Sequence, residues 1–169
     1  FSCCNKLHQV VLPISIEEIE DSAFENCSSL KSISLPMALK TIGDGALKGT
    51  GLRTIEIPKS VFWLGDGLLA DCQSMEHVTI PENIGRIPDR MFEGCTNLKK
   101  VELHEKLGVI GERAFFGCSS LDFIVIPDSV KQIGQDAFTN TDKQFIIQCS
   151  FGSYAEEYAR KNKFKYQLV

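Results

Sequence analysis

Residues 95–117 read CTNLKKVELHEKLGVIGERAFFG, and most of the 169-residue chain repeats this stretch with substitutions. If the Leu that follows Cys-x-x is taken as a marker, equivalent positions lie 22 or 23 residues apart, at Leu7, Leu30, Leu52, Met75, Leu98 and Leu121. A fixed period of this length is typical of a solenoid, whose stacked coils share one core. Residues 1–149 are therefore predicted to form six coils and a shortened seventh, with a truncated coil before the first.

Two apolar columns follow each marker, three and five positions later, as at Val101 and Leu103. A period of two and the many β-branched residues predict one short strand per coil, with both columns on its inner face. Proline comes next in every coil except one, where His104 takes its place. Because proline has no N–H to donate to a neighbouring strand, it ends the strand where the coil turns.

A second apolar pair follows the proline at a spacing of three residues, as at Leu107 and Ile110. This spacing predicts a short extended piece with a bend, after which glycine gives a permissive backbone at Gly43, Gly65, Gly111 and Gly134. A smaller residue and then a larger one, as at Ala114 and Phe115, predict a helical turn whose large side chain fills the interior.

Cysteine forms a further column, at Cys4, Cys27, Cys72, Cys95 and Cys118. Seven cysteines can indicate disulfides or a metal site, but parallel side chains on stacked coils are poorly aimed for bridging. We interpret the column as buried free thiols that act as small hydrophobic groups. The only plausible candidates for a bridge are Cys3, beside Cys4, and Cys149, which lie outside the column.

The pattern changes near the C-terminus, where residues 150–169 are predicted to cap the open end of the core. Ser153 and Glu156 have the spacing of a capping box at a helix start. Phe164, Tyr166 and Leu168 then alternate as a short final strand. At the other end, residues 1–7 lie inside a repeat and lack a polar cap, so we expect a longer parent protein with further repeats upstream.

The net charge of −4 is small and mixed in sign, so no basic surface for nucleic acid is expected. No apolar run reaches the 18 or so residues of a membrane span, so no membrane insertion is expected in this segment. His8, His77 and His104 occupy different columns, and Gly43-Asp44-Gly45 lacks the spacing of a phosphate loop. We therefore expect no enzyme, no metal site and no cofactor.

The outward positions of the first strands remain as a candidate binding surface for a protein or glycan. The residues of this surface are Thr54, Glu56, His77, Thr79, Lys100, Glu102, Phe123 and Val125. Phe123 and Val125 are apolar where solvent is expected, which favours either an interaction patch or packing against the C-terminal cap. Trp63, beside Phe62, is either a contact residue on the opposite side or a partly buried one.

The repeat unit L-x-x-I-x-I-P-x-x-V-x-x-I-G-x-x-A-F-x-x-C, nearly intact from Leu121 to Phe138, resembles the BspA-like or Treponema pallidum type of leucine-rich repeat. The ending GSYAEEYARKNKFKY is similar to the terminator of many such bacterial proteins. The resemblance implies a right-handed horseshoe or rod, with a parallel sheet on the concave face, turns and helical turns opposite, and a C-terminal helical cap.

The resemblance also implies a secreted or cell-surface protein, bacterial or from a protist, that mediates adhesion or protein contact. A cytoplasmic location stays open, because free thiols fit a cytosol as well as an anaerobic exterior. The function predicted from these observations is a non-catalytic binding scaffold. The alternative is a structural spacer or stalk without a ligand of its own.

Overall fold

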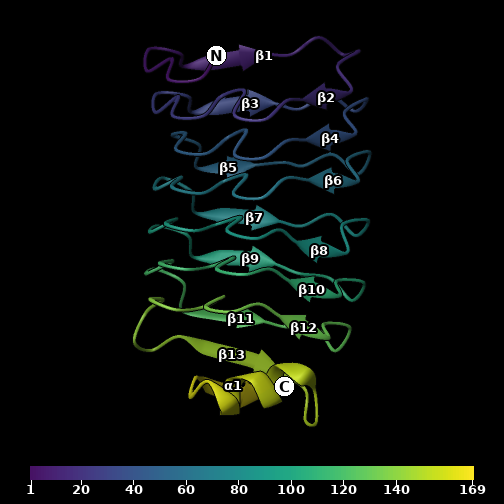
Figure 1. The fold of residues 1–169 in the computed structure, drawn as a ribbon, viewed down its shortest axis with the longest axis vertical. Coiled ribbons are helices and arrows are strands. Elements are labelled where there is room, and N and C mark those ends of the chain that lie inside the picture. Colours follow the sequence, from purple (N-terminus) through teal and green to yellow (C-terminus); the bar gives the residue numbers. More distant parts are fainter.

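The computed structural model describes all 169 residues as a stack of parallel coils with one helix at its C-terminal end (Figure 1). Each coil contributes a strand to a first row, which consists of β1 (Gln9–Val11), β3 (Ser32–Ser34), β5 (Thr54–Ile55), β7 (His77–Thr79), β9 (Lys100–Glu102), β11 (Phe123–Val125), β13 (Ile146–Cys149) and β14 (Lys165–Leu168). A second row on the other side consists of β2 (Glu18–Ile19), β4 (Thr41–Ile42), β6 (Trp63–Leu64), β8 (Arg86–Ile87), β10 (Val109–Ile110) and β12 (Gln132–Ile133).

The coils stack in the register that the sequence period predicts. In the first row, Ile55 pairs with Val78, and Val78 pairs with Val101, all in parallel strands. The second row follows the same rule, since Val109 of β10 is paired with Arg86 on one side and Gln132 on the other. The prediction of a parallel-strand solenoid is therefore confirmed.

A tight turn connects the two rows in each coil. The carbonyl of the column proline accepts a hydrogen bond from the N–H three residues later, as between Pro36 and Leu39 at 3.0 Å. His104 replaces the proline in the fifth coil and makes the same bond to Leu107 at 3.0 Å. The turn therefore needs the carbonyl of this position and tolerates the loss of the proline ring.

The glycines that follow the second strand of a coil are needed because the coils pack closely, and not because the backbone adopts an unusual conformation there. None of Gly43, Gly65, Gly111 or Gly134 has a positive φ. A Cβ at Gly43 would lie 2.6 Å from the backbone nitrogen of Asp21, and one at Gly111 would lie 2.6 Å from that of Asp89. Any larger residue would push adjacent coils apart, so the expected permissive role gives way to a steric one.

Successive tight turns stand where helical turns were expected. In the first coil, Ser22 has φ 52° and Asn26 has φ 59°, and these left-handed residues interrupt a helical path. The turn backbone bonds to the next coil, since the Phe24 N–H donates to the Ala46 carbonyl at 2.8 Å. Stacking of coils, and not local helix formation, therefore determines the conformation of this segment.

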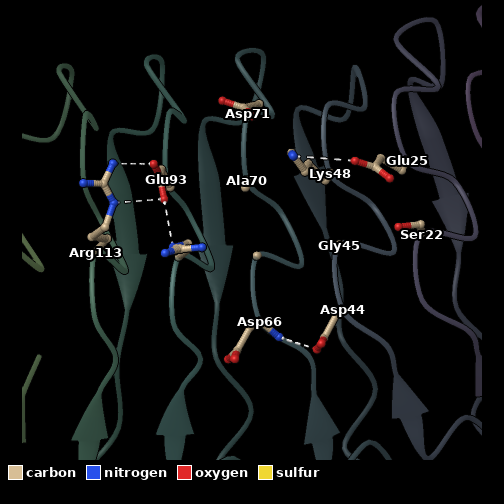
Figure 2. A pocket seen from close by; sticks show the side chains of 12 residues that line it. Ser22, Glu25, Asp44, Gly45, Lys48, Asp66, Ala70, Asp71, Glu93 and Arg113 are labelled. Atoms are coloured by element: carbon tan, nitrogen blue, oxygen red, sulfur yellow. Dashed lines mark hydrogen bonds and ion pairs between the residues drawn. The ribbon is translucent and has the colours of Figure 1, made fainter.

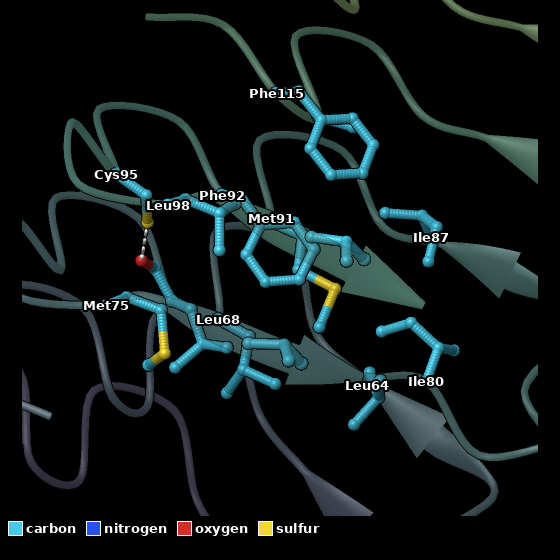
Figure 3. Close-up of a cluster of buried hydrophobic side chains, with 14 of the residues drawn as sticks. Leu64, Leu68, Met75, Ile80, Ile87, Met91, Phe92, Cys95, Leu98 and Phe115 are labelled. Carbon is cyan, nitrogen blue, oxygen red and sulfur yellow. Dashed lines mark hydrogen bonds between the residues drawn. The ribbon is translucent and has the colours of Figure 1, made fainter. Parts of the chain in front are cut away.

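The large residues of the turn segments form a stacked column inside the solenoid (Figure 3). Ring centroids lie 5.2 Å apart between Phe92 and Phe115 and 5.3 Å apart between Phe115 and Phe138. These rings belong to one continuous cluster of 43 buried residues, so all the coils share a single core. The prediction that this residue fills the interior is confirmed.

Helix α1 (Tyr154–Lys161) covers the C-terminal end of this core, with β14 beside β13. The Ser153 hydroxyl accepts from the Glu156 N–H at 3.2 Å, and the Glu156 carboxylate accepts from the Gly152 N–H at 2.7 Å. This arrangement agrees with the predicted capping box, with the carboxylate bond shifted by one residue. No helix in the structure has the length and apolar character that crossing a bilayer requires.

Candidate functional site

The eight predicted surface residues lie together on one side of the first row, called here the first-strand face. Thr54, His77 and Lys100 are successive register partners in β5, β7 and β9. Their neighbours in sequence, such as Val78, point into the core, and the alternation of strand side chains leaves these three outside. The other five members of the face are Glu56, Thr79, Glu102, Phe123 and Val125.

Four polar side chains of this face form a connected network across β7 and β9. The Lys100 ammonium donates to Glu102 Oε1 at 2.6 Å, and the Thr79 hydroxyl donates to Glu102 Oε2 at 3.1 Å. His77 Nε2 lies 3.3 Å from the same hydroxyl. The bond from Lys100, followed by that from Thr79, holds the pKa of Glu102 below its ordinary value, so this carboxylate stays charged.

A hollow of about 540 Å³ opens at the N-terminal side of this network. Thr54, Glu56, His77 and Thr79 line it together with Met37, whose side chain is 74% exposed. Four of the predicted residues therefore border one concavity. Sequence reasoning missed Met37, which follows the column proline in the second coil. Its signal was an exposed position filled by a large apolar residue, as for Phe123.

Phe123 and Val125 lie on β11, next to the network, and remain 43% and 48% exposed. Their register partners on β13 are Ile146 and Gln148, and helix α1 packs beyond that strand. The alternative in which the C-terminal cap covers these two residues is thus wrong. Both side chains stay accessible because the cap closes the end of the stack and not the face of the sheet.

The remaining histidines are not brought to this face. His8 belongs to the first coil, and His104 follows β9 at the turn that leads to the second row. No three His, Cys, Asp or Glu side chains converge in a way that suits a metal ion. The arrangement of the first-strand face therefore offers hydrogen bonds, charge and apolar contact to a partner.

The prediction of a buried cysteine column is correct for Cys27, Cys72, Cys95 and Cys118 and wrong for Cys4, which is exposed at the N-terminal end of the stack. The buried thiols also do more than fill space. Cys72, Cys95 and Cys118 each donate through Sγ to a backbone carbonyl of the preceding coil, at 3.1, 3.1 and 3.2 Å. Thr50 occupies the same column and donates to the Leu47 carbonyl at 2.8 Å. Threonine in place of cysteine in one coil indicates that this position needs a hydrogen-bond donor. The interpretation of the column as small hydrophobic groups missed this requirement.

Burial also makes these thiols poor nucleophiles. Desolvation raises the pKa of Cys72 to about 11 and that of Cys118 to about 12. Among the candidates for a bridge, Cys3 and its neighbour Cys4 are exposed in the truncated coil before the first, whereas Cys149 is buried in β13. Because these positions are at opposite ends of the stack, Cys149 cannot pair with either of them within one chain.

A second surface lies on the turn segments, where a polar groove of about 510 Å³ crosses several coils (Figure 2). Gly45 and Gly67 line it, together with Lys48 from the same turn as Gly45 and Arg113 from two coils beyond Gly67. Arg113 donates to Glu93 at 2.6 Å. The sequence analysis did not predict this groove. The signal for it is that Gly45 and Gly67 occupy a column in which the other coils have larger residues.

Comparison with known proteins gives a consistent result. A family model described as the BspA type leucine rich repeat region matches six copies, over residues 1–121 and 86–165. A leucine rich cell surface protein from Faecalibacterium prausnitzii is 34% identical over 85% of this chain, with a TM-score of 0.78. A leucine-rich repeat protein from Bacteroides ovatus is 25% identical over 100% of this chain, with a TM-score of 0.69.

The Treponema pallidum leucine rich repeat protein shares the fold, at 24% identity over 83% of this chain and a TM-score of 0.55. The chain spans 39% of the F. prausnitzii structure, 56% of the B. ovatus structure and 58% of the T. pallidum structure. Among curated proteins, none matches the sequence.

Proposed function

Because the chain belongs to the BspA-type leucine-rich repeat family, we propose that it is a non-catalytic scaffold that binds another protein through its first-strand face. A solenoid of this kind presents an extended, rigid surface, and such surfaces are used for binding. The proposal gives no residue a catalytic role and requires no metal or cofactor. Its histidines belong to different coils, whereas a nucleophilic or zinc site needs its groups close together.

The observation that carries this proposal is the exposed pair Phe123 and Val125 beside a fixed polar network. Protein interfaces combine an apolar centre with a polar rim of charged and hydrogen-bonding groups. Here the apolar pair lies on β11, and Lys100 and Glu102 occupy the equivalent positions on the adjacent strand β9. The ion pair between Lys100 and Glu102 is already formed, so fewer side chains must be ordered when a partner binds.

We further propose that the protein acts at the cell surface or after secretion, in adhesion. The support is the similarity to a F. prausnitzii protein that is named as a cell surface protein. The chain corresponds to 39% of the length of that relative, so the role is proposed for the repeat segment.

The double variant Phe123→Ser/Val125→Ser tests the binding surface. The second coil carries Ser32 and Ser34 in the same two columns, so the fold accepts serine at both positions. Val11→Ser is the matched control, because Val11 is an equally apolar outward residue, 80% exposed, at the other end of the row.

Each form is immobilised, and bound extracellular proteins are quantified by mass spectrometry. We expect at least one protein to be retained by the wild type and the control and lost from the double variant. If every retained protein binds the double variant equally well, the proposed surface is wrong. If no protein is retained by any form, the segment acts instead as a spacer that separates other domains.

A further inference from the structure

The repeats provide an internal reference for what the fold requires at each outward position. Every column is occupied in six coils, so a departure at an exposed position is not demanded by packing. Three departures meet in neighbouring coils on the second row and the adjoining turns. We call this surface the aromatic trough and define it by Asp44, Gly45, Phe62, Trp63, Asp66, Gly67, Gly85 and Arg86.

The first departure is the aromatic pair Phe62 and Trp63. The Phe62 column holds Glu17, Lys40, Gly85, Gly108 and Lys131 in the other coils, and the Trp63 column holds Glu18, Thr41, Arg86, Val109 and Gln132. The two rings are 63% and 57% exposed. Their backbone is fixed by the sheet, since both N–H groups donate to the Lys40 carbonyl, at 2.9 and 3.4 Å. A rigid backbone therefore presents two large aromatic side chains to solvent.

The second departure is the open space beside this pair. Gly85 occupies the Phe62 column in the next coil, and a Cβ built there would meet no atom within 4 Å. The resulting hollow has a volume of about 340 Å³ and also borders Ile84, Arg86 and Pro88. It adjoins the aromatic pair on the side of the fourth coil, so a ligand can lie against the aromatic side chains.

The third departure is the glycine pair Gly45 and Gly67. Their column holds Ser22, Arg90, Arg113 and Asp136 in the other coils, and all six residues have φ between 52° and 62°. Since four coils accept a side chain in this conformation, the backbone does not require glycine at the other two. The two glycines line the hollow of about 510 Å³ whose side chains Figure 2 shows.

Two carboxylates join the hollows, because Asp44 and Asp66 border both of them. Asp44 Oδ1 accepts from the Asp66 N–H at 2.8 Å (Figure 2). Asp66 Oδ1 accepts in the same way from the Asp89 N–H at 3.0 Å. These bonds fix both side chains and leave each Oδ2 free to accept from a ligand. Arg86 Nη2 lies 3.4 Å from Asp66 Oδ1 and 3.0 Å from Asp89 Oδ1. These two ion pairs hold the guanidinium, a hydrogen-bond donor, beside the two carboxylates.

The charges around the trough are nearly balanced. The linings of the two hollows carry the carboxylates of Glu25, Asp44, Asp66, Asp71 and Glu93 and the cations of Lys48, Arg86, Arg90 and Arg113. A polyanion would meet the carboxylates and a polycation would meet the arginines, so neither is favoured. An apolar peptide side chain prefers a more enclosed, mainly apolar pocket. The larger hollow is lined mainly by polar or charged residues, and the hollow beside the aromatic pair also contains Asp44, Asp66 and Arg86.

We propose that the aromatic trough binds a neutral oligosaccharide. The apolar face of a sugar ring lies against Phe62 and Trp63, as aromatic side chains with a polar surround permit. Ring hydroxyls donate to Asp44 and Asp66 and accept from Arg86, and further sugar units extend into the hollow at Gly45 and Gly67. The trough lies on the second row and the turns, so this binding is independent of the protein partner proposed for the first-strand face.

The sole tryptophan of the chain is Trp63, so its fluorescence reports on the trough directly. The intact chain is titrated with four neutral pentasaccharides: maltopentaose, cellopentaose, mannopentaose and chitopentaose. Pentalysine and a heparin pentasaccharide are titrated in parallel as charged probes. We expect a saturable change in emission with at least one neutral sugar and none with either charged probe.

Two variants that copy residues from other coils block the trough without a change in fold. Gly85→Lys adds the side chain that Lys40 and Lys131 carry in the same column. Gly67→Arg adds the side chain that Arg90 and Arg113 carry at a φ of 57° and 53°. The matched control is Gln132→Lys, which adds a lysine to the second row two coils beyond Arg86.

Both blocking variants are expected to weaken sugar binding by about tenfold or more, which corresponds to about 1.4 kcal/mol, while the control binds as the wild type does. Circular dichroism verifies that each variant is folded. The proposal is overturned if no neutral sugar binds, if a charged probe binds in their place, or if the blocking variants and the control bind alike. Saturation-transfer NMR on the variant Trp63→Thr gives a second readout. This variant places at position 63 the residue type of its register partner Thr41, and the sugar signal is expected to be lost.

Discussion

The two ends of the stack bury the same columns to different extents. In the sixth coil, Leu121 and Ile124 are 0% and 1% exposed. Their equivalents in the first coil, Leu7 and Val10, are only partly buried. The sequence of the columns is the same at both ends, so the amino acids alone do not produce the difference.

What differs is the presence of a neighbour on both sides. At the C-terminal end, the Phe138 ring lies 5.3 Å from Phe145 and 6.3 Å from Phe164, so later segments cover it. At the N-terminal end, Phe24 stacks on Phe1 at 5.7 Å, and Phe1 itself is 76% exposed. A coil therefore completes its core only between two neighbours, and α1 with β14 takes the place of a further coil.

The largest expected contrast between the ends is in thiol reactivity. Cys3 and Cys4 are exposed in the truncated coil at the N-terminal end, whereas Cys72 and Cys118 are buried between coils and have raised pKa values. Buried thiols react only when the structure opens, so their rates are expected to be lower by a factor on the order of a thousand or more. Labelling with a chromogenic disulfide reagent, followed by peptide mapping, measures these rates. Equal rates along the chain would contradict the stacked structure.

Truncation of one ring at each end is expected to have unequal effects on stability. Phe138→Ala removes a fully buried ring, and large-to-small changes of this kind lower the free energy of unfolding by about 3–5 kcal/mol. Phe1→Ala removes a ring that is 76% exposed and is expected to lower it by less than about 1 kcal/mol. Urea unfolding of both variants makes the comparison. Similar losses would show that the two ends are equally well closed.

The start of α1 offers a smaller perturbation of the closed end. Ser153→Ala removes the hydroxyl that accepts from the Glu156 N–H and is expected to lower the free energy of unfolding by about 1 kcal/mol. Ser150→Ala serves as a control outside the helix. Loss of stability in the control, with none in Ser153→Ala, would show that the cap does not depend on this hydrogen bond.

Surface ion pairs between coils are expected to contribute least. Bonds from Arg53, together with the charge of Lys99, lower the pKa of Glu76, and Lys106 does the same for Glu82. A carboxyl group whose pKa is lower in the folded state stabilises the fold at high pH, and this contribution is lost as the pH falls through the folded pKa. Urea unfolding is therefore expected to become slightly easier as the pH drops below about 4.5, an effect that salt reduces. A stability that rises as the pH falls over this range would contradict these ion pairs.

Most of the fold could be predicted from the sequence, because each column repeats the same structural requirement in every coil. The inward position of Val78 and Val101 and the stacking of Phe92 on Phe115 both follow from the period alone. Local rules failed where the neighbouring coil sets the conformation. The turn segments were expected to be helical, yet residues such as Ser22 adopt a positive φ as their backbone bonds to the next coil.

The candidate surfaces were less predictable, since they depend on how outward side chains meet across strands. The positions of Lys100 and Glu102 on one face followed from strand alternation, whereas their bonds to each other and to Thr79 did not. The groove at Gly45 and Gly67 was missed for a different reason. A missing side chain gives no local signal, and only comparison with the same column in other coils reveals it.

Both proposed surfaces depend on the stacking in register of residues that lie one coil apart in sequence. Nuclear Overhauser contacts measured on an isotope-labelled sample test this stacking directly in the middle of the first row. Stacking in register predicts backbone contacts from Val78 to Ile55 on one side and to Val101 on the other, in the parallel pattern. Contacts from Val78 to any other pair of strands, or in an antiparallel pattern, would contradict it.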